Sequence, residues 1–265
     1  MSRRFAFLDH EGPLAFAHRG GALEGAENTL AAFERAVELG YEYLETDAHA
    51  TSDGVLLAFH DHTLDRVTDS RGRIADLPYS GVRRARIGGV HEIPLLEDLL
   101  GTWPRVRFNI DVKEAGAIGP LATVIRRTNA YDRVCLTSFS DERLAAARAA
   151  MGREVCSALG PRGVAALRAA ASSSGYGRLL RRLARSGIPC AQVPMGFRGL
   201  PVTTRSFVRT AHAVGMQVHV WTINSEPRME HLLDLGVDGI MTDNITGLRG
   251  VLERRGLWHP GDLAA

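Results

Sequence analysis

The sequence predicts an α/β protein, a TIM (β/α)8 barrel, from three observations. Strand-like and helix-like segments alternate nearly end to end along the 265 residues, which is typical of a parallel sheet with helices outside it. No strand candidate is followed by the glycine-rich turns GxGxxG or GxxxxGKS/T, which disfavours a doubly wound sheet. The length suits one large barrel, and no linker of domain-boundary size interrupts it, so we expect a single domain over residues 1–265.

The N-terminal elements contain one ambiguity. The first strand is expected at Leu14–His18, a short apolar run, and the first helix at 30–40, where apolar residues recur at helical spacing. The next two strand candidates, 41–47 and 54–60, are joined by only a few residues, which is too short for a parallel crossover. One of this pair is therefore expected to be a hairpin arm or an extension of the barrel rim.

The alternation resumes after an irregular segment at 62–93, which is rich in Arg, Asp and Gly. Further strands are expected at 106–112, 134–138, 154–159, 188–193, 217–222 and 239–242. Helices are expected at 94–100, 117–127, 141–151, 164–171, 179–186, 204–214, 226–235 and 245–254. This makes nine strand candidates for the eight places of a barrel.

Composition and charge disfavour several classes of function. The formal net charge of +2 is too small to indicate nucleic acid or a membrane surface as a partner. No apolar run has the length of a signal-peptide core or a membrane span, so we expect a cytoplasmic protein without an integral membrane segment. Cys135, Cys156 and Cys190 are expected to be buried reduced thiols, because their odd number and the lack of CxxC spacing disfavour disulfides and zinc.

Acidic residues stand at the ends of strand candidates, where a (β/α) barrel has its active site. Glu45 and Asp47 are two residues apart and therefore face the same side of their strand. Asp111 stands near the end of another strand candidate. Three carboxylates at one barrel mouth repel each other, and a hard divalent cation removes that cost. Since Mg²⁺ and Ca²⁺ prefer oxygen ligands, we expect one of them to bind these three acids.

Two histidines stand at the ends of different strand candidates. His18 and His60 would flank the expected cation, and their ordinary pKa near neutrality suits a general acid–base pair. The neighbouring His49 and His62 are not expected to take a direct part.

Two cations accompany these groups. Arg19 directly follows His18, where its guanidinium could grip phosphate oxygens. Lys113 is the only lysine of the sequence and shares a strand face with Asp111. Because arginine is used at every other cationic position, the lysine indicates that a compact charge is required there.

These residues belong to a longer series of motifs that resembles the glycerophosphodiester phosphodiesterase family. In order, the motifs are HRG (18–20), ENT (27–29), ExD (45–47), TxDG (51–54), HD (60–61), LDRVT (64–68), GxIxDL (72–77), IPLLEDLL (93–100), SF (138–139), VWTIN (220–224) and DGIMTD (238–243). Each motif alone is weak, but their order and spacing from about residue 14 to 254 are specific.

The resemblance implies a barrel with a small insertion after the HD motif, which matches the irregular segment 62–93. It implies that His18 and His60 act as acid and base. It also implies a cation, usually Mg²⁺ or Ca²⁺, held by Glu45, Asp47 and a third carboxylate.

The resemblance implies four substrate contacts as well. Arg19 and Lys113 would hold the phosphate, Glu27 would lie near the site as a metal-shell or substrate contact, and Trp221 would wall the pocket. The sequence departs from the family pattern at Ala26, where proline is usual, which should affect only loop stiffness. It also has Asp111 where the family usually has Glu, a feature shared with the related sphingomyelinase D enzymes. The adjacent Glu114 is expected to point to the opposite face of the strand.

The implied reaction is hydrolysis of a glycerophosphodiester to an alcohol and glycerol 3-phosphate. Two alternatives stay open at this point. One is a lyase similar to sphingomyelinase D that acts on lysophospholipids and leaves a cyclic phosphate, and the other is a non-catalytic barrel that binds phosphodiesters. The sequence does not identify the alcohol group, the metal, the roles of the two histidines or the oligomeric state.

Overall fold

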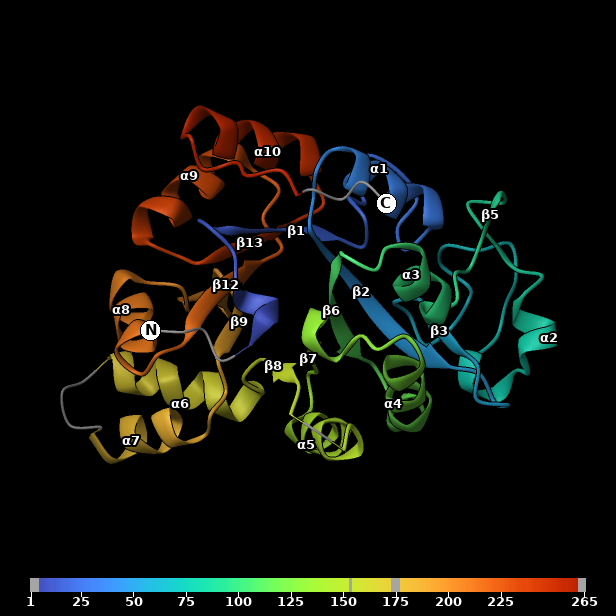
Figure 1. The fold of residues 1–265 in the computed structure, drawn as a ribbon, viewed down its shortest axis with the longest axis horizontal. Helices are drawn as coiled ribbons and strands as arrows, with labels where there is room; N and C mark the ends of the chain where they lie inside the picture. Colours follow the sequence, from blue (N-terminus) through green and yellow to red (C-terminus); the bar gives the residue numbers. More distant parts are fainter. Residues whose placement is uncertain (1–4, 153, 173–176, 262–265) are drawn as a thin grey trace.

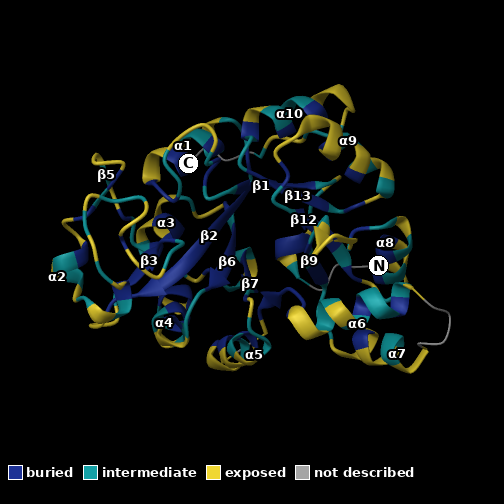
Figure 2. Cartoon of the chain, turned by 180° about the vertical axis from the view of Figure 1, so that it is seen from behind, coloured by how far each residue is buried: buried dark blue, intermediate teal, exposed yellow. Residues whose placement is uncertain are grey.

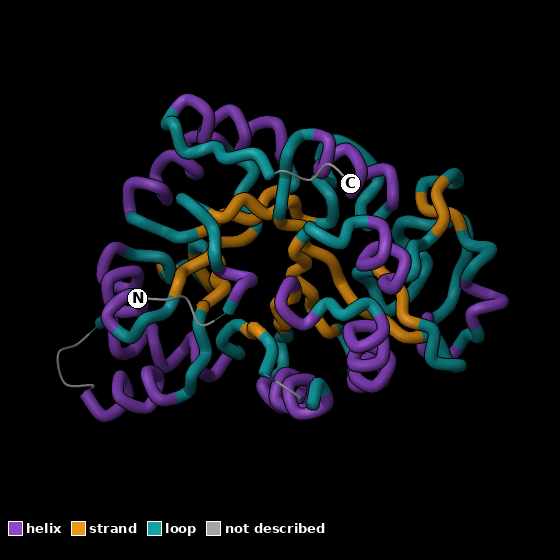
Figure 3. The backbone as a smooth tube through the Cα atoms, viewed as in Figure 1, coloured by secondary structure: helices purple, strands orange, loops and turns teal. Residues whose placement is uncertain are grey.

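The computed structural model describes residues 5–152, 154–172 and 177–261, and its centre is a ring of strands surrounded by helices (Figures 1 and 3). In this part of the chain, neighbouring strands of the ring pair in parallel. In spatial order they are β8 (Cys156–Ser157), β7 (Val134–Thr137), β6 (Arg107–Val112), β2 (Tyr43–Ala50), β1 (Leu14–His18), β13 (Gly239–Thr242), β12 (Gln217–Trp221) and β9 (Cys190–Pro194).

The ring closes between its first and last strands. A parallel bridge joins Ala158 to Cys190, and the Leu159 N–H donates to the Cys190 carbonyl at 2.9 Å. The contact between β8 and β9 is short, because the strand expected at 154–159 is only two residues long in the structure. The predicted TIM barrel is nevertheless confirmed.

The ninth strand candidate lies outside the parallel ring. Of residues 54–60, only β3 (Leu56–Ala58) is a strand, and it runs antiparallel to the far end of β2. The turn between the two strands is too short to carry the chain back across the barrel, so it makes a hairpin, as one of the two sequence alternatives held. The expectation that His60 ends a barrel strand was therefore wrong. His60 instead returns to the mouth because the Phe59 N–H donates to the Asp47 carbonyl at 2.9 Å.

Helices cover the outside of the barrel, with exposed outer faces and buried strands between them (Figure 2). They are α1 (Leu30–Glu38), α2 (Tyr79–Val82), α3 (Leu96–Thr102), α4 (Ile118–Arg127), α5 (Asp141–Ala150), α6 (Pro161–Ala171), α7 (Gly177–Arg185), α8 (Arg205–Ala213), α9 (Glu226–Leu235) and α10 (Ile245–Arg254). Thr29, Ser140 and Thr204 each cap a helix by accepting a hydrogen bond from the backbone three residues on. α6 begins earlier than expected because Pro161 is well tolerated in the first turn.

Short elements complete the chain. Four are 3-10 turns: η1 (Ala6–Leu8), η2 (Ile74–Asp76), η3 (Ala115–Ala117) and η4 (Tyr131–Arg133). Two are small antiparallel hairpins: β4 (Arg86–Ile87) with β5 (His91–Glu92), and β10 (Gly196–Phe197) with β11 (Leu200–Pro201).

The irregular segment after the HD motif lies beside the barrel, at the right edge of Figure 1, and contains η2, α2 and the β4–β5 hairpin. Its apolar side chains pack with Leu57 of β3 and with Phe59 in a small core separate from the main one, to which the segment contributes Leu64, Ile74, Val82, Ala85, Ile87 and Ile93. This core anchors a segment that has almost no regular structure. Because the segment starts directly after the His60–Asp61 pair, it borders one side of the barrel mouth.

The end of the barrel opposite the mouth, where β1 and β2 begin, is apolar. Phe7 of η1 packs against Phe16 and Tyr43, and the hydroxyl of Tyr43 donates to the Phe7 carbonyl at 2.8 Å. The three cysteines belong to the same cluster and are buried and free, as predicted. Although they are far apart in the sequence, their sulfur atoms lie within 4.8 Å of one another, because they stand on the adjacent strands β7, β8 and β9.

Candidate active site

Three buried carboxylates lie near the carboxyl ends of two neighbouring strands. Glu45 and Asp47 are on β2, and Asp111 is on β6, directly in register with Asp47. Their exposed fractions are 5%, 1% and 4%, so they are buried acids and not a solvated rim. The structure thus brings together the three acids that the sequence assigned to one cation.

Asp47 is surrounded by donors and positive charge. Its Oδ1 lies 2.8 Å from the Nζ of Lys113, and its Oδ2 accepts a hydrogen bond from the Asn28 side chain at 3.0 Å. The Nε of Arg19 is 3.4 Å from the same Oδ2. Burial alone would raise the pKa of Asp47, but the charges of Lys113 and Arg19 lower it below its ordinary value. Asp47 is therefore held ionised.

The negative charges of Asp111 and Glu45 are compensated less fully than that of Asp47. The Nζ of Lys113 lies 2.6 Å from Asp111 Oδ2, whereas Asp111 Oδ1 is buried without a hydrogen-bond partner in the structure. Burial raises the pKa of Asp111, and burial together with the charge of Asp47 raises the pKa of Glu45 to about 7. A buried acceptor without a donor in an all-oxygen set fits a hard cation such as Mg²⁺ or Ca²⁺.

His18 borders the carboxylates from β1. Its Nδ1 donates to Asp243 Oδ1 at 2.6 Å, and its Nε2 lies 3.6 Å from Glu45 Oε2. Asp243 follows β13 and is held in turn by the side chain of Asn224, which donates to its Oδ2 at 2.9 Å. Burial alone would lower the pKa of His18, but the charge of Glu45 and the bond to Asp243 raise it.

His60 has a comparable carboxylate behind it, supplied by its own neighbour. The Nδ1 of His60 donates to Asp61 Oδ1 at 2.6 Å, and Arg66 Nε donates to Asp61 Oδ2 at 2.5 Å. The bonds from Arg66 and His60 lower the pKa of Asp61 to about 2. Burial lowers the pKa of His60; the charge of Asp47 opposes this shift, and that of Lys113 adds to it.

Arg19 and Glu27 link the two histidine sides. The Nη1 of Arg19 donates to Glu27 Oε1 at 3.1 Å, and Arg66 donates to both oxygens of Glu27, at 3.0 and 2.6 Å. These contacts lower the pKa of Glu27 against the effect of its burial. Both cations predicted to hold phosphate, Arg19 and Lys113, are thus paired with carboxylates in the structure.

Aromatic side chains form another wall of the mouth. Trp221 ends β12, and its ring packs edge-on against Phe139, with centroids 5.6 Å apart. Phe139 follows β7, is 68% exposed, and lies 5.8 Å from the Nζ of Lys113. Trp221 therefore contacts Phe139, whose ring in turn lies near the ammonium of Lys113.

Sequence reasoning gave no role to several residues that hold the site together: Asn28, Arg66, Phe139, Asn224 and Asp243. Asn28, Phe139, Asn224 and Asp243 stand within motifs and close to strand or helix ends, which was a signal that could have identified them. Arg66 stands within the LDRVT motif, but its partners lie 5 and 39 residues away in the sequence, and the motif gave no indication of them.

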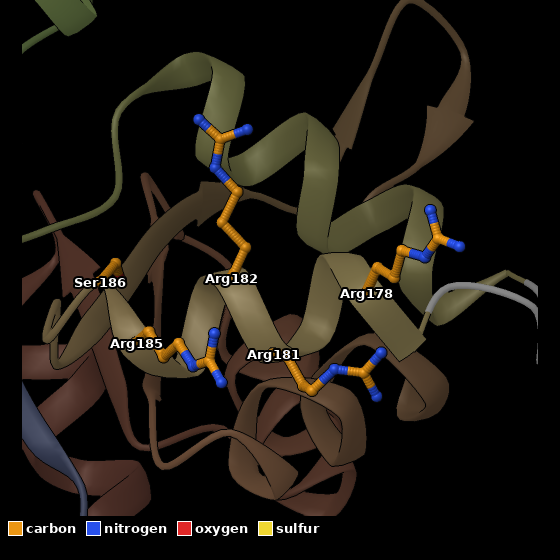
Figure 4. Close-up of a pocket in the computed structure, with 5 residues that line it drawn as sticks. All are labelled: Arg178, Arg181, Arg182, Arg185 and Ser186. Carbon is orange, nitrogen blue, oxygen red and sulfur yellow. The ribbon is translucent and has the colours of Figure 1, made fainter.

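A different cavity, of about 520 Å³, lies along α7 and is lined by Arg178, Arg181, Arg182, Arg185 and Ser186 (Figure 4). The guanidinium groups of Arg181 and Arg182 point to opposite sides of the helix in this view. All the lining residues come from one helix and the residue after it, and none comes from a strand end. We therefore place the candidate active site at the barrel mouth and not in this cavity.

A closed (β/α)8 barrel with buried acids, two carboxylate-backed histidines and two cations at its mouth has the groups expected of an enzyme that acts on phosphoesters. The family model for the glycerophosphoryl diester phosphodiesterase family matches residues 18–246. The chain belongs to this family, whose members are phosphoric diester hydrolases, and the resemblance drawn from the motifs is confirmed.

Individual relatives agree with the family assignment. A probable glycerophosphodiester phosphodiesterase 2 of Mycobacterium tuberculosis is 41% identical over 95% of this chain and 95% of its own length. The human lysophospholipase D GDPD1 is 28% identical over 89% of this chain and 85% of its own.

Solved structures show the same fold at lower identity. A putative glycerophosphoryl diester phosphodiesterase of Silicibacter pomeroyi has a TM-score of 0.81 and 22% identity, covering 96% of this chain and 100% of its own. A phosphodiesterase of Oleispira antarctica, solved with the product sn-glycerol-3-phosphate, has a TM-score of 0.75 and 22% identity, covering 91% of this chain and 97% of its own.

Among the helices of the described residues, none combines the length and the apolar character that a membrane span requires.

Proposed function

We propose that this enzyme hydrolyses glycerophosphodiesters to an alcohol and glycerol 3-phosphate with the help of a divalent cation, Mg²⁺ or Ca²⁺. The observation that carries the proposal is the convergence of Glu45, Asp47 and Asp111 beside Lys113, with a carboxylate-backed histidine on either side. This combination supplies charge neutralisation and proton transfer, the two requirements for cleaving a phosphodiester.

Glu45, Asp47 and Asp111 would hold the cation. The partnerless Oδ1 of Asp111 and the raised pKa of Glu45 support this assignment, because both indicate negative charge that the protein alone compensates incompletely. When bound, the cation would act as a Lewis acid that withdraws charge from a phosphoryl oxygen.

Arg19 and Lys113 would orient the phosphate. Each is partly buried and paired with two carboxylates, Arg19 with Glu27 and Asp47 and Lys113 with Asp47 and Asp111, which hold it at the mouth. If a cation takes over part of the charge of Asp47 and Asp111, the ammonium of Lys113 can turn to a phosphate oxygen.

His18 and His60 would transfer the protons. Their Nδ1 atoms donate to Asp243 and Asp61, which fixes both rings and leaves Nε2 as the atom that exchanges a proton with the substrate. One Nε2 would accept the proton of the nucleophile, and the other would donate a proton to the leaving alkoxide.

The test is a panel of glycerophosphodiesters assayed with Mg²⁺, Ca²⁺ or chelator, with the products identified by phosphorus NMR. We expect release of glycerol 3-phosphate, loss of turnover in chelator and recovery on adding one of the two cations. Full activity in excess chelator would contradict the metal assignment, and the absence of turnover on every substrate under all three conditions would contradict the hydrolase assignment.

A second candidate reaction is favoured by Asp111, the residue type that resembles the sphingomyelinase D pattern. In that case a glycerol hydroxyl would lose its proton to one histidine and attack the phosphorus of a lysophospholipid. The bond from phosphorus to the headgroup oxygen would break, the headgroup would leave as an alcohol protonated by the other histidine, and a cyclic phosphodiester would form. The same NMR experiment, extended to lysophospholipids, separates the two, because a cyclic phosphodiester and a phosphomonoester have different phosphorus shifts.

A further inference from the structure

A second group of potential metal ligands lies outside the carboxylate cluster. It consists of His49 near the end of β2, His62 at the start of the inserted segment, and Glu114 just after β6. One ligand atom from each lies within 4.8 Å of the others. His49 is fully buried, Glu114 is partly buried and His62 is exposed, so the group extends from the protein interior to solvent.

The hydrogen bonds of His49 fix which of its nitrogens is available. Its Nε2 lies 3.1 Å from the carbonyl oxygen of His60, and because a carbonyl can only accept, Nε2 must carry the proton. In neutral His49, the Nδ1 lone pair then faces Glu114 Oε1 at 3.2 Å. Two acceptors at this distance require a proton or a cation between them.

This arrangement is the one found for metal-binding histidines. Such a histidine usually donates its remaining ring N–H to a carboxylate or a backbone carbonyl, which orients the ring for the metal. In this protein, the carbonyl of His60 accepts the remaining ring N–H of His49. The carboxylate of Glu114 is held in addition by the Ala50 N–H, which donates to its Oε1 at 3.3 Å.

His62 offers a third ligand atom and is exposed to solvent. Its ring lies edge-on to that of His49, with centroids 5.0 Å apart. Its backbone is held by the Ile74 N–H, which donates to the His62 carbonyl at 3.0 Å, while its exposed side chain can rotate onto an incoming ion. Two imidazoles and one carboxylate are the ligands of a borderline transition-metal ion, whereas Mg²⁺ and Ca²⁺ prefer oxygen.

We propose that His49, His62 and Glu114 form a binding site for a divalent transition-metal cation such as Zn²⁺, Ni²⁺ or Co²⁺, separate from the cluster of Glu45, Asp47 and Asp111. The ion replaces the proton between His49 and Glu114, and water completes its coordination. The site adjoins the backbone of His60, because His49 Nε2 donates to the carbonyl oxygen of that residue.

The test uses Co²⁺ as a spectroscopic probe on the full chain without a polyhistidine tag, in excess Mg²⁺ to occupy the carboxylate cluster. We expect one equivalent of Co²⁺ to give d–d absorption bands of nitrogen and oxygen ligation, and Zn²⁺ to displace it. H62A should weaken the affinity at least tenfold, in line with the loss of one of three ligands, and E114Q should weaken it in the same direction.

The matched control is H231A, which removes an exposed histidine from α9 and should bind Co²⁺ like the wild type. Thermal unfolding of the metal-free variants checks that each is folded. Wild-type affinity in folded H62A, equal losses in H62A and H231A, or no Co²⁺ binding by the wild type would each overturn the proposal. Since binding is measured without turnover, this outcome is independent of the proposed hydrolase reaction.

Discussion

The two histidines at the barrel mouth have the same kind of carboxylate support, but it is built in different ways. His18 is held by Asp243, 225 residues away in the sequence, because β1 and β13 are neighbouring strands. His60 is held by the adjacent Asp61, which depends on Arg66 in the inserted segment. The His18 side chain is 15% exposed and the His60 side chain 33% exposed.

This difference indicates two kinds of rigidity. The His18 side is fixed by the hydrogen-bonded ladder of the barrel and by a largely buried His–Asp pair, which salt screens little. The His60 side depends on ion pairs of a half-exposed arginine, which mobile ions screen. The pKa shifts are also opposite, raised for His18 and lowered for His60, so the two rings are prepared differently before substrate arrives.

The largest expected effect comes from removing either ring. We expect H18A and H60A each to lower kcat by about 100- to 10,000-fold, the usual contribution of a positioned acid or base. Steady-state kinetics on a glycerophosphodiester measures this, with H231A on the outer surface as control. Near-normal kcat in either folded variant would show that the two rings do not form a catalytic pair.

The second largest effect is expected from neutralising Asp243, whose carboxylate accepts the hydrogen bond from His18 Nδ1. D243N should lower kcat by about 10- to 100-fold, the range seen when residues that orient functional imidazoles are changed. The control is D238N, which alters an Asp–His pair of similar geometry on the outer surface, where His212 Nε2 lies 2.7 Å from Asp238 Oδ2. If both variants lost activity equally, orientation of His18 would not be the cause.

A smaller effect is expected from the support of His60. R66A should lower kcat about twofold to fivefold at low salt, because exposed ion pairs contribute up to about 1 kcal/mol. The wild type should approach R66A as salt increases, whereas D243N should keep its ratio to the wild type. R254A is a suitable control, since Arg254 also pairs with two glutamates, Glu226 and Glu230, far from the mouth.

The smallest effect concerns stability and pH. The pKa of Asp61 is lowered from its ordinary value of 3.8 to about 2, so ionised Asp61 stabilises the fold above pH 3.8. That contribution is lost as the pH falls from about 4 through about 2. Urea unfolding should therefore find D61N less stable than the wild type at pH 6, with a difference that shrinks towards pH 2. A difference independent of pH would contradict the ion-pair account of this side.

Much of the site could be predicted because it depends on strand ends. Glu45 and Asp47 were expected on one face from their spacing, and the structure places Asp111 in register with Asp47. His60 was expected at the end of a parallel barrel strand, and this expectation was wrong, because the preceding strand β3 is the second arm of a hairpin with β2. The spacing rule could not predict this, since a hairpin and a rim extension leave the same pattern in a sequence.

Other features could not be predicted because they depend on which strands become neighbours. The pairing of His18 with Asp243, and of Glu27 with Arg66, joins residues whose separation in the sequence carries no signal. The three cysteines appeared unrelated for the same reason. His49 and Glu114 were set aside as bystanders, and only the register of β2 against β6 brings them together.

By itself, the sequence determined the class of fold, the family and the chemical groups available, because periodicity, motif order and residue type are local properties of a chain. Tertiary structure alone decided which of those groups meet. The barrel places β1 beside β13, the first and last strands in the sequence, and a short turn sends β3 back to the mouth, so charges that are distant along the chain interact over a few ångströms. Those short distances in a buried site, and not composition, set the pKa shifts and the capacity to bind cations.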